Sequence, residues 1–142
     1  MCFLWIKANT SAIKRLKTKV KTVLIVDDST SLREFISIIL KNAGYDVVMA
    51  ENGKDALNRL NGFNDARVDI VITDLNMPVM NGIEFVKQMR GTSMYSSIPV
   101  VLMTSELHES KKQEAKQAGV SEWINKPFTS RQLKDTIKKF IK

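Results

Sequence analysis

The stretch VLIVDD, at residues 23–28, decides the fold because four apolar residues run directly into two carboxylates. Every position of the apolar part is hydrophobic, which is typical of a strand that is covered on both faces in a parallel sheet. A carboxylate is costly to bury unless a cation or hydrogen bonds compensate for its lost hydration. The stretch therefore predicts a central strand that ends at a polar site.

The rest of the chain repeats this pattern of short strands separated by amphipathic helices. Strands are expected at residues 23–26, 46–50, 69–73, 100–104 and 122–125. Helices are expected within residues 30–44, 53–60, 81–90 and 108–119, and after a cap at Thr129 or Ser130. Five strand–helix units predict an α/β fold, a doubly wound, five-stranded parallel sheet with helices on both faces.

The positive charge is concentrated at the N-terminus. The formal net charge is +7, but residues 1–21 hold six Lys or Arg and no acidic residue, which leaves 16 basic and 15 acidic residues in the remainder. We expect residues 1–20 to form a basic extension that is disordered or loosely packed, and residues 21–142 to form one domain that does not itself bind nucleic acid. Ile13, Leu16 and Val20 lie at helical spacing, so the extension could also anchor the protein to anionic lipid or nucleic acid.

Composition excludes several other classes of protein. A single Cys, Cys2, rules out an internal disulfide, and with one His the chain lacks ligands for a structural zinc site. No apolar run approaches the roughly 18 residues of a membrane-spanning helix. We therefore expect a cytoplasmic protein without a membrane span.

Chemically suggestive residues stand at the ends of four predicted strands. Asp27 and Asp28 follow the first strand, Asp74 follows the third, Thr104 ends the fourth and Lys126 follows the fifth. Parallel strands bring these ends to one edge of the sheet, where such folds bind ligands. Three close carboxylates repel one another unless a cation joins them, and Mg²⁺ prefers oxygen ligands of this kind.

Lys126 needs a separate explanation, since an ammonium is no metal ligand. A compact cation beside a metal site suits an incoming phosphoryl group, whose charge both can stabilise. A carboxylate can itself be the nucleophile and form an aspartyl phosphate. In DLNMPVMNG, at residues 74–82, Pro78 and Gly82 shape a loop that presents Asp74.

Together these motifs resemble the receiver domain of two-component response regulators, most closely the stand-alone chemotaxis (CheY-like) type. The resemblance runs from about Lys21 to the C-terminus and includes TDLNMP at residues 73–78 and NKPF at residues 125–128. It implies the flavodoxin-like strand order 2-1-3-4-5. The Lys126–Pro127 bond resembles one that is cis in the family.

The resemblance also implies a role for each residue of the site. Asp74 would accept a phosphoryl group from a phosphohistidine of a sensor histidine kinase. Asp28 would coordinate Mg²⁺ directly, Asp27 mostly through water, and Asn76 through its backbone carbonyl. Thr104 would bond the phosphoryl oxygen and shift on phosphorylation, and Lys126 would pair with the phosphate.

Three further positions concern the duration and output of the signal. Asn76 and Glu106 occupy the two positions that tune the lifetime of the acyl phosphate in this family, and the pair resembles regulators whose phosphate is lost quickly. Trp123 stands at the aromatic switch position, where Tyr or Phe is usual. It either moves inward incompletely on phosphorylation or faces a partner permanently. The neighbouring helix, at residues 109–118, has a thin apolar face and is expected to belong to the output surface.

Several functions remain to be compared. A flavin-binding flavodoxin would need a phosphate-binding loop where Asp27 and Asp28 stand, so electrostatics excludes it. A phosphatase of the haloacid dehalogenase type lacks its Asp-x-Asp motif here and would turn over many substrate molecules. We expect a monomeric response regulator that is not an enzyme. Since no output domain follows Lys142, we expect it to act by protein contact, with a flagellar motor switch or kinase complex as its target. The alternative is a phosphorelay intermediate that passes the group to a histidine phosphotransfer protein.

Overall fold

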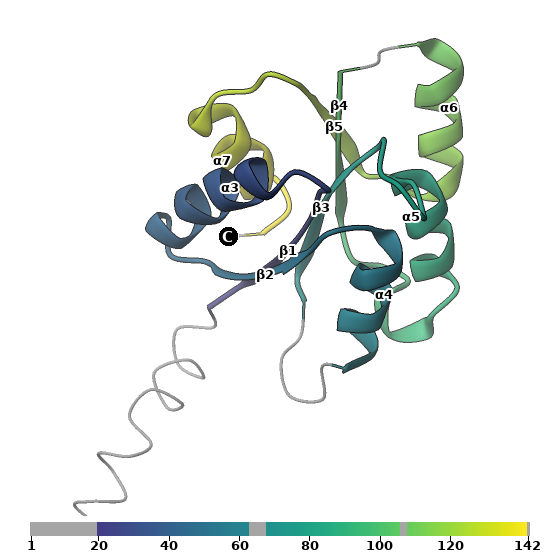
Figure 1. Cartoon of the computed structure of the whole chain (residues 1–142), viewed down its shortest axis with the longest axis horizontal. Coiled ribbons are helices and arrows are strands. Elements are labelled where there is room, and N and C mark those ends of the chain that lie inside the picture. The colour runs from purple at the N-terminus through teal and green to yellow at the C-terminus, as the bar shows by residue number, and fades with distance from the viewer. Residues whose placement is uncertain (1–19, 63–67, 106–107, 142) are drawn as a thin grey trace, which may run out of the picture.

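Strand β1 (Thr22–Val26) lies between β2 (Asp46–Ala50) and β3 (Ile70–Asp74), and β4 (Val100–Thr104) and β5 (Glu122–Asn125) extend the sheet beyond β3. All four pairings are parallel, which gives the order β2-β1-β3-β4-β5 (Figure 1). These features come from a computed structural model, which describes residues 20–62, 68–105 and 108–141. The sheet confirms the strand order that the resemblance implied. The predicted N-terminal extension lies outside the described residues except for Val20.

Helices cover both faces of the sheet (Figure 1). On one face lie α3 (Thr30–Asn42) and α7 (Ser130–Lys138), which contact each other. On the other lie α4 (Gly53–Gly62), α5 (Gly82–Arg90) and α6 (Glu109–Ala118), with the short 3₁₀ helix η1 (Ser93–Tyr95) after α5. The predicted doubly wound arrangement is therefore confirmed.

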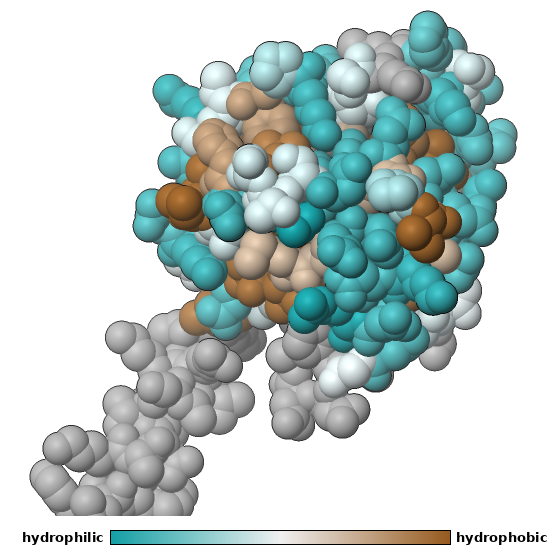
Figure 2. All heavy atoms as spheres, viewed as in Figure 1, coloured by the Kyte–Doolittle hydropathy of each residue, from teal (hydrophilic) through white to brown (hydrophobic). Residues whose placement is uncertain are grey.

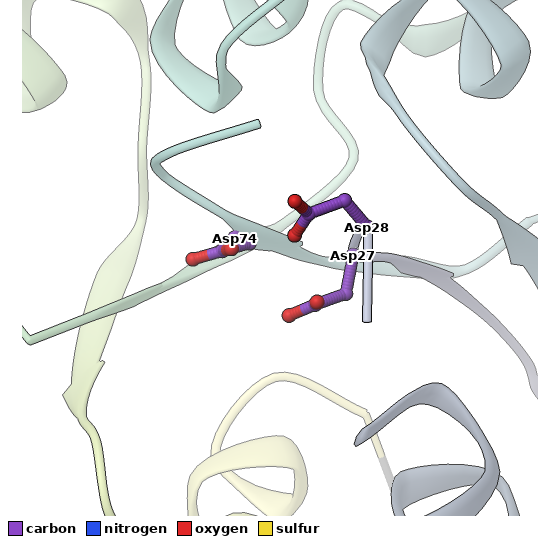
Figure 3. A group of neighbouring side chains, drawn as sticks. All are labelled: Asp27, Asp28 and Asp74. Atoms are coloured by element: carbon purple, nitrogen blue, oxygen red, sulfur yellow. The ribbon is translucent and has the colours of Figure 1, made fainter. Parts of the chain in front are cut away.

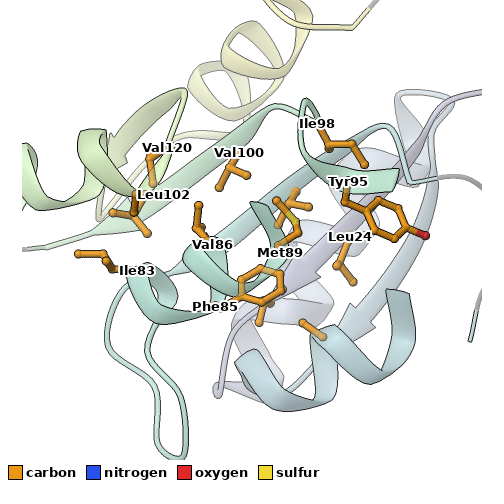
Figure 4. Close-up of a cluster of buried hydrophobic side chains, with 14 of the residues drawn as sticks. Leu24, Ile83, Phe85, Val86, Met89, Tyr95, Ile98, Val100, Leu102 and Val120 are labelled. Atoms are coloured by element: carbon orange, nitrogen blue, oxygen red, sulfur yellow. The ribbon is translucent and has the colours of Figure 1, made fainter. Parts of the chain in front are cut away.

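Side chains of the strands alternate between two hydrophobic cores, one on each face. In β1, Leu24 and Val26 join the core under α4, α5 and α6, and Val23 and Ile25 join the core under α3 and α7. The first of these cores, shown in Figure 4, contains Phe85 from α5, and Tyr95, whose hydroxyl donates a hydrogen bond to the Leu60 carbonyl oxygen 3.0 Å away. Every residue of β1, β3 and β4 is buried, as the continuous apolar runs predicted.

The helix boundaries follow from local capping. Ser29 caps α3 by accepting from the Leu32 amide, and Asn81 caps α5 by accepting from the Glu84 amide. Thr129, rather than Ser130, caps α7, in a capping box with Gln132. Asn81 is thus a cap and not the first helical residue of α5.

Strand β3 begins and ends one residue later than predicted. Asp69, the expected first residue, uses its carboxylate oxygen Oδ2 to accept a 2.8 Å hydrogen bond from the Thr22 amide at the start of β1. At the other end Asp74 pairs with Met103 and is part of the strand. The acidic residue therefore sits on the rigid sheet and not in the loop that follows.

The surface in Figure 2 is mostly hydrophilic, with separate brown patches. Among the described residues, the large hydrophobic side chains that are exposed anywhere on the surface are Phe35, Ile38, Met49, Val79 and Met94. Within the described part of the chain, no helix has the length and apolar character needed to cross a bilayer.

Candidate functional site

Three carboxylates meet at the carboxyl ends of β1 and β3. Asp27 and Asp28 follow β1 directly, and Asp74 is the last residue of β3. One carboxylate oxygen of each lies within 4.8 Å of the other two, and Figure 3 shows the three side chains projecting into the same region. Asp27 is 1% exposed and Asp74 is 7% exposed, whereas Asp28 faces solvent. The site thus has a buried floor and an open side.

Asp27 is fixed by hydrogen bonds on three of its groups. Its side-chain oxygen Oδ1 accepts from the Ser29 amide at 2.8 Å, its own amide donates to the Ala50 carbonyl at 3.1 Å, and its carbonyl accepts from the Arg33 guanidinium. The remaining oxygen, Oδ2, lies 3.4 Å from the Lys126 ammonium. The contact with Arg33 was not foreseen, because an arginine in the first turn of a helix gives no sign in the sequence of a backbone partner six residues earlier.

Lys126 reaches across the sheet to both buried carboxylates. Its ammonium nitrogen Nζ lies 3.0 Å from Asp74 Oδ1, closer than to Asp27. The Lys126 amide donates to the Thr104 carbonyl at 3.0 Å, so the end of β4 positions the start of this loop. The Lys126–Pro127 peptide bond is cis, as the resemblance implied.

Burial dominates the electrostatics of Asp74. Loss of hydration raises the pKa of Asp74, and the charge of Asp27 adds to this, although the hydrogen bond and charge of Lys126 act in the opposite direction. Burial would lower the pKa of Lys126, but its hydrogen bond to Asp74 and the charges of Asp74 and Asp27 raise it overall. Among the described residues, the Lys126 ammonium pairs with two of the three clustered carboxylates, so the site is short of positive charge.

The oxygen atoms that the three carboxylates offer show whether a metal ion could supply the missing positive charge. Its three side chains offer hard carboxylate oxygens, and two of them are held in place by the sheet and by hydrogen bonds. Oxygen ligands suit Mg²⁺, whereas zinc and copper sites use histidine or cysteine. The residues therefore fit a hard divalent cation.

The loop after β3 shapes the open side. Gly82 lies so close to Asp74 that a Cβ there would stand 2.2 Å from the Asp74 carbonyl oxygen, and its amide donates to the Leu75 carbonyl at 2.9 Å. Asn76 is exposed at the start of this loop. Val79 is 76% exposed with a φ of 72°, and the Met80 amide bonds the Pro78 carbonyl across it, which is a γ-turn. The left-handed valine was not predicted, because only Pro78 and Gly82 carried a turn signal.

The remaining predicted residues lie around the site or on its flank. Thr104 is buried at the end of β4, and its carbonyl is the group that holds Lys126. Trp123 in β5 is half-buried, packs against the core under α4 to α6, and has the Lys112 ammonium 5.6 Å from its ring centroid. It also lines a hollow of about 350 Å³ with Asn125 and Lys139, between β5 and α7. Glu106 lies outside the described residues.

Known proteins share both this sequence and this fold. Residues 23–138 match the family described as the response regulator receiver domain. The chain is 40% identical over 116 residues to chemotaxis protein CheY1 of Helicobacter pylori, covering 81% of this chain and 92% of that protein. The CheY homolog of Campylobacter jejuni is also 40% identical over 116 residues, with 81% and 88% covered.

A solved structure extends the likeness to three dimensions. The chemotaxis protein CheY4 of Vibrio cholerae superposes with a TM-score of 0.81 at 42% identity, and the match covers 86% of this chain and 99% of that chain. The region of the family match includes Asp27, Asp28, Asp74, Thr104 and Lys126. The likeness therefore spans the whole sheet and every strand end that forms the site.

Proposed function

Because the chain belongs to the response regulator receiver domain family, we propose that it is a signalling protein that accepts a phosphoryl group on Asp74 from a sensor histidine kinase. The observation that supports this most is the position of the Asp74 carboxylate. It is buried at the end of a rigid strand, 3.0 Å from a lysine ammonium and beside two further carboxylates. Such a carboxylate is held ready as a nucleophile and as a metal ligand.

Mg²⁺ would be held by Asp27, Asp28 and Asp74 and by the backbone carbonyl of Asn76. When bound, it supplies positive charge that stabilises the oxygens of the transferring phosphoryl group. The negative charges of the buried Asp27 and Asp74 would then be compensated by this ion and by Lys126. Asp28, which faces solvent, gives the ion a ligand on the open side of the site.

The transfer itself uses the side chains of this chain. An oxygen of ionised Asp74 attacks the phosphorus of the phosphohistidine, the new P–O bond forms, and the P–N bond breaks with its electron pair leaving on the imidazole. The Lys126 ammonium, which touches Asp74 before the reaction, stays beside the phosphoryl oxygens and balances their charge. Thr104 would donate its hydroxyl to one of these oxygens, since it ends the neighbouring strand β4.

Output follows by protein contact, on the surface formed by α6, β5 and α7. Trp123 lies there half-buried under Lys112, and the apolar residues of α6 that are buried are only Ala115 and Ala118. The relatives that match at 40% identity are chemotaxis proteins, which supports a role in chemotaxis with a flagellar motor switch protein as the target. The protein turns over no external substrate in this role.

Phosphorylation with a small donor tests the proposal. Purified protein is treated with acetyl phosphate and Mg²⁺, and its intact mass is followed. We expect one base-labile phosphoryl group per chain and no continuing release of phosphate beyond the decay of that adduct. The Asp74→Asn variant should gain none, while Glu84→Gln, an exposed carboxylate on α5, should react as the parent does. Sustained turnover of acetyl phosphate, or an adduct that survives Asp74→Asn, would contradict the proposal.

The adduct should also be short-lived. Asn76 and Glu106 stand at the two positions that resemble those of rapidly dephosphorylating regulators. Replacing both should lengthen the half-life of the phosphorylated protein in the absence of any partner. An unchanged decay rate would contradict this assignment.

A further inference from the structure

Arg33, in the first turn of α3, reaches back to the acidic site with its side chain. One terminal nitrogen of its guanidinium donates a hydrogen bond to the Asp27 carbonyl, and the other donates to the Thr30 hydroxyl at 3.3 Å. The residue is partly buried, and its own amide donates to the Ser29 carbonyl at 3.0 Å. The main chain and the side chain of Arg33 therefore both tie the start of α3 to the end of β1.

The bonds that Arg33 makes go to neutral oxygens. Within the described part of the chain, the basic residues that form ion pairs with carboxylates are Arg59, Lys111, Lys126 and Lys139. A guanidinium offers five N–H donors in a rigid planar fork, so bonds from its two ends fix the relative position of both acceptors. Arg33 therefore supplies geometry to its partners and does not neutralise a carboxylate.

The carbonyl that Arg33 binds belongs to the peptide group between the two adjacent acids. A peptide group is planar and includes the Cα atoms on both sides, so a bond to its oxygen orients the Cα atoms of Asp27 and Asp28 together. The Asp27 carboxylate is also held by the Ser29 amide, whereas Asp28 faces solvent. The backbone that Asp28 shares with Asp27 therefore does most to place its side chain.

The orientation of this peptide group matters for the acidic cluster. Figure 3 shows the side chains of Asp27 and Asp28 leaving the chain in different directions and both turning toward Asp74. One oxygen of each lies within 4.8 Å of the other two. A rotation of the peptide group would move the Asp28 carboxylate away from the other two, and the three could then no longer hold one ion.

We propose that Arg33 is a positioning residue for the Mg²⁺ site. Its bonds to the Asp27 carbonyl and the Thr30 hydroxyl hold the peptide group between Asp27 and Asp28 in the orientation in which both carboxylates can bind one ion. The inference rests on the proposed metal-dependent function. Arg33 would itself touch neither the ion nor the phosphoryl group, and it would act through the two acids.

Charge and position make opposite predictions for this residue. A guanidinium near a bound cation repels it, so if charge alone mattered, removing Arg33 would strengthen Mg²⁺ binding. If Arg33 positions the two acids, its removal weakens Mg²⁺ binding, because the carboxylates are no longer held ready. The direction in which the Kd changes therefore separates the two roles.

Calorimetric titration of the folded protein with Mg²⁺ tests the proposal. We expect Arg33→Met to weaken Mg²⁺ binding roughly tenfold, as is typical when a group that orients metal ligands is lost. Arg33→Lys keeps the charge but cannot bond both acceptors in the same geometry, so its affinity should lie between those of Arg33→Met and the parent. Thr30→Val keeps the charge and a β-branched side chain, and should weaken binding roughly threefold through the loss of one hydrogen bond.

The controls separate this effect from a general loss of stability. Arg59→Met removes an arginine on α4 that pairs with Asp55 at 3.7 Å, and should leave the affinity for Mg²⁺ unchanged. Urea unfolding in EDTA measures the stability of each variant without the ion. A purely structural role for Arg33 would lower that stability and leave the Kd of the folded protein as it is in the parent, which would overturn the proposal.

The other contrary outcomes are equally specific. Mg²⁺ binding by Arg33→Met that is as tight as in the parent, or tighter, would overturn the proposal. If Arg33→Met does not fold, Arg33→Lys gives the answer, and an unchanged affinity there would overturn it. A parent protein that binds no Mg²⁺ would overturn both this inference and the proposed function, whereas a parent that binds the ion no better than its Arg33 variants would overturn this inference alone.

Discussion

Gly82 lies directly against the backbone of Asp74, and a Cβ at Gly82 would stand 2.2 Å from the Asp74 carbonyl oxygen. No side chain can be tolerated at that distance, and the neighbouring atom is backbone that belongs to a buried strand. The Gly82 amide, in turn, bonds the Leu75 carbonyl. A glycine eight residues after Asp74 therefore sets how the loop approaches this carboxylate.

Gly82→Ala is expected to destabilise the protein by about 2 kcal/mol, because the loop must move away from β3 to relieve the overlap. The same movement should slow phosphorylation of Asp74 by acetyl phosphate. Urea unfolding and intact-mass kinetics measure the two effects. Gly62→Ala is the control, since a Cβ at Gly62 in α4 meets nothing within 4 Å and should leave both quantities unchanged or raise stability slightly. Equal stability of the two variants would contradict the contact.

Val79→Asn is expected to stabilise the protein by about 1 kcal/mol. A β-branched residue is strained at a φ of 72°, and asparagine tolerates a positive φ more readily. Little packing is lost, because Val79 is 76% exposed. Met94→Asn, another exposed apolar residue without a positive φ, should give no gain. Thermal or urea unfolding measures both, and a destabilised Val79→Asn would show that the turn is not strained.

Mg²⁺ is expected to raise the unfolding temperature of the protein. An ion that binds only the folded state stabilises it by RT ln(1 + [Mg²⁺]/Kd), about 2.7 kcal/mol at one hundred times the Kd. Asp28→Asn removes one of the three clustered carboxylates and should weaken this response. Glu84→Gln should keep it. A response to Mg²⁺ that Asp28→Asn leaves intact would place the ion elsewhere.

Without Mg²⁺, Asp74→Asn is expected to be more stable than the parent at neutral pH. Burial raises the pKa of Asp74 in the folded state above its ordinary value of 3.8. The Asp74 carboxyl group therefore contributes fully to the stability of the folded state below pH 3.8, where it is protonated in both states. This contribution is lost as the pH rises through the folded-state pKa of Asp74. Urea unfolding in EDTA at several pH values measures this. The advantage of Asp74→Asn should shrink as the solution is made acidic, and an advantage that grows on acidification would have the wrong sign.

Lys126→Met is expected to strengthen Mg²⁺ binding roughly tenfold while it slows phosphorylation. The ammonium lies 3.0 Å from Asp74 and 3.4 Å from Asp27, so it repels a cation bound to the same carboxylates. Calorimetric titration measures the affinity. Lys139→Met removes an ammonium that pairs with Glu122 and should change neither quantity. Weaker Mg²⁺ binding by Lys126→Met would show that the lysine helps to form the metal site.

Much of the fold and the site could be predicted because strand burial and strand order leave direct signals in the sequence. Continuous apolar runs identified β1, β3 and β4, and parallel topology alone brings Asp27, Asp74 and Lys126 together. Other features depend on contacts between distant residues. Asp69, just before β3, is joined to Thr22, 47 positions away, through both its amide and its carboxylate. The close approach of Gly82 to Asp74 likewise appears only when the chain is folded.

The hydrogen bond from the Lys126 amide to the Thr104 carbonyl makes two adjacent strand ends a single mechanical unit. Lys126 follows β5 directly, and Trp123 precedes it by three residues on that strand. We therefore expect a displacement at the end of β4 to reach Trp123 through the backbone of β5.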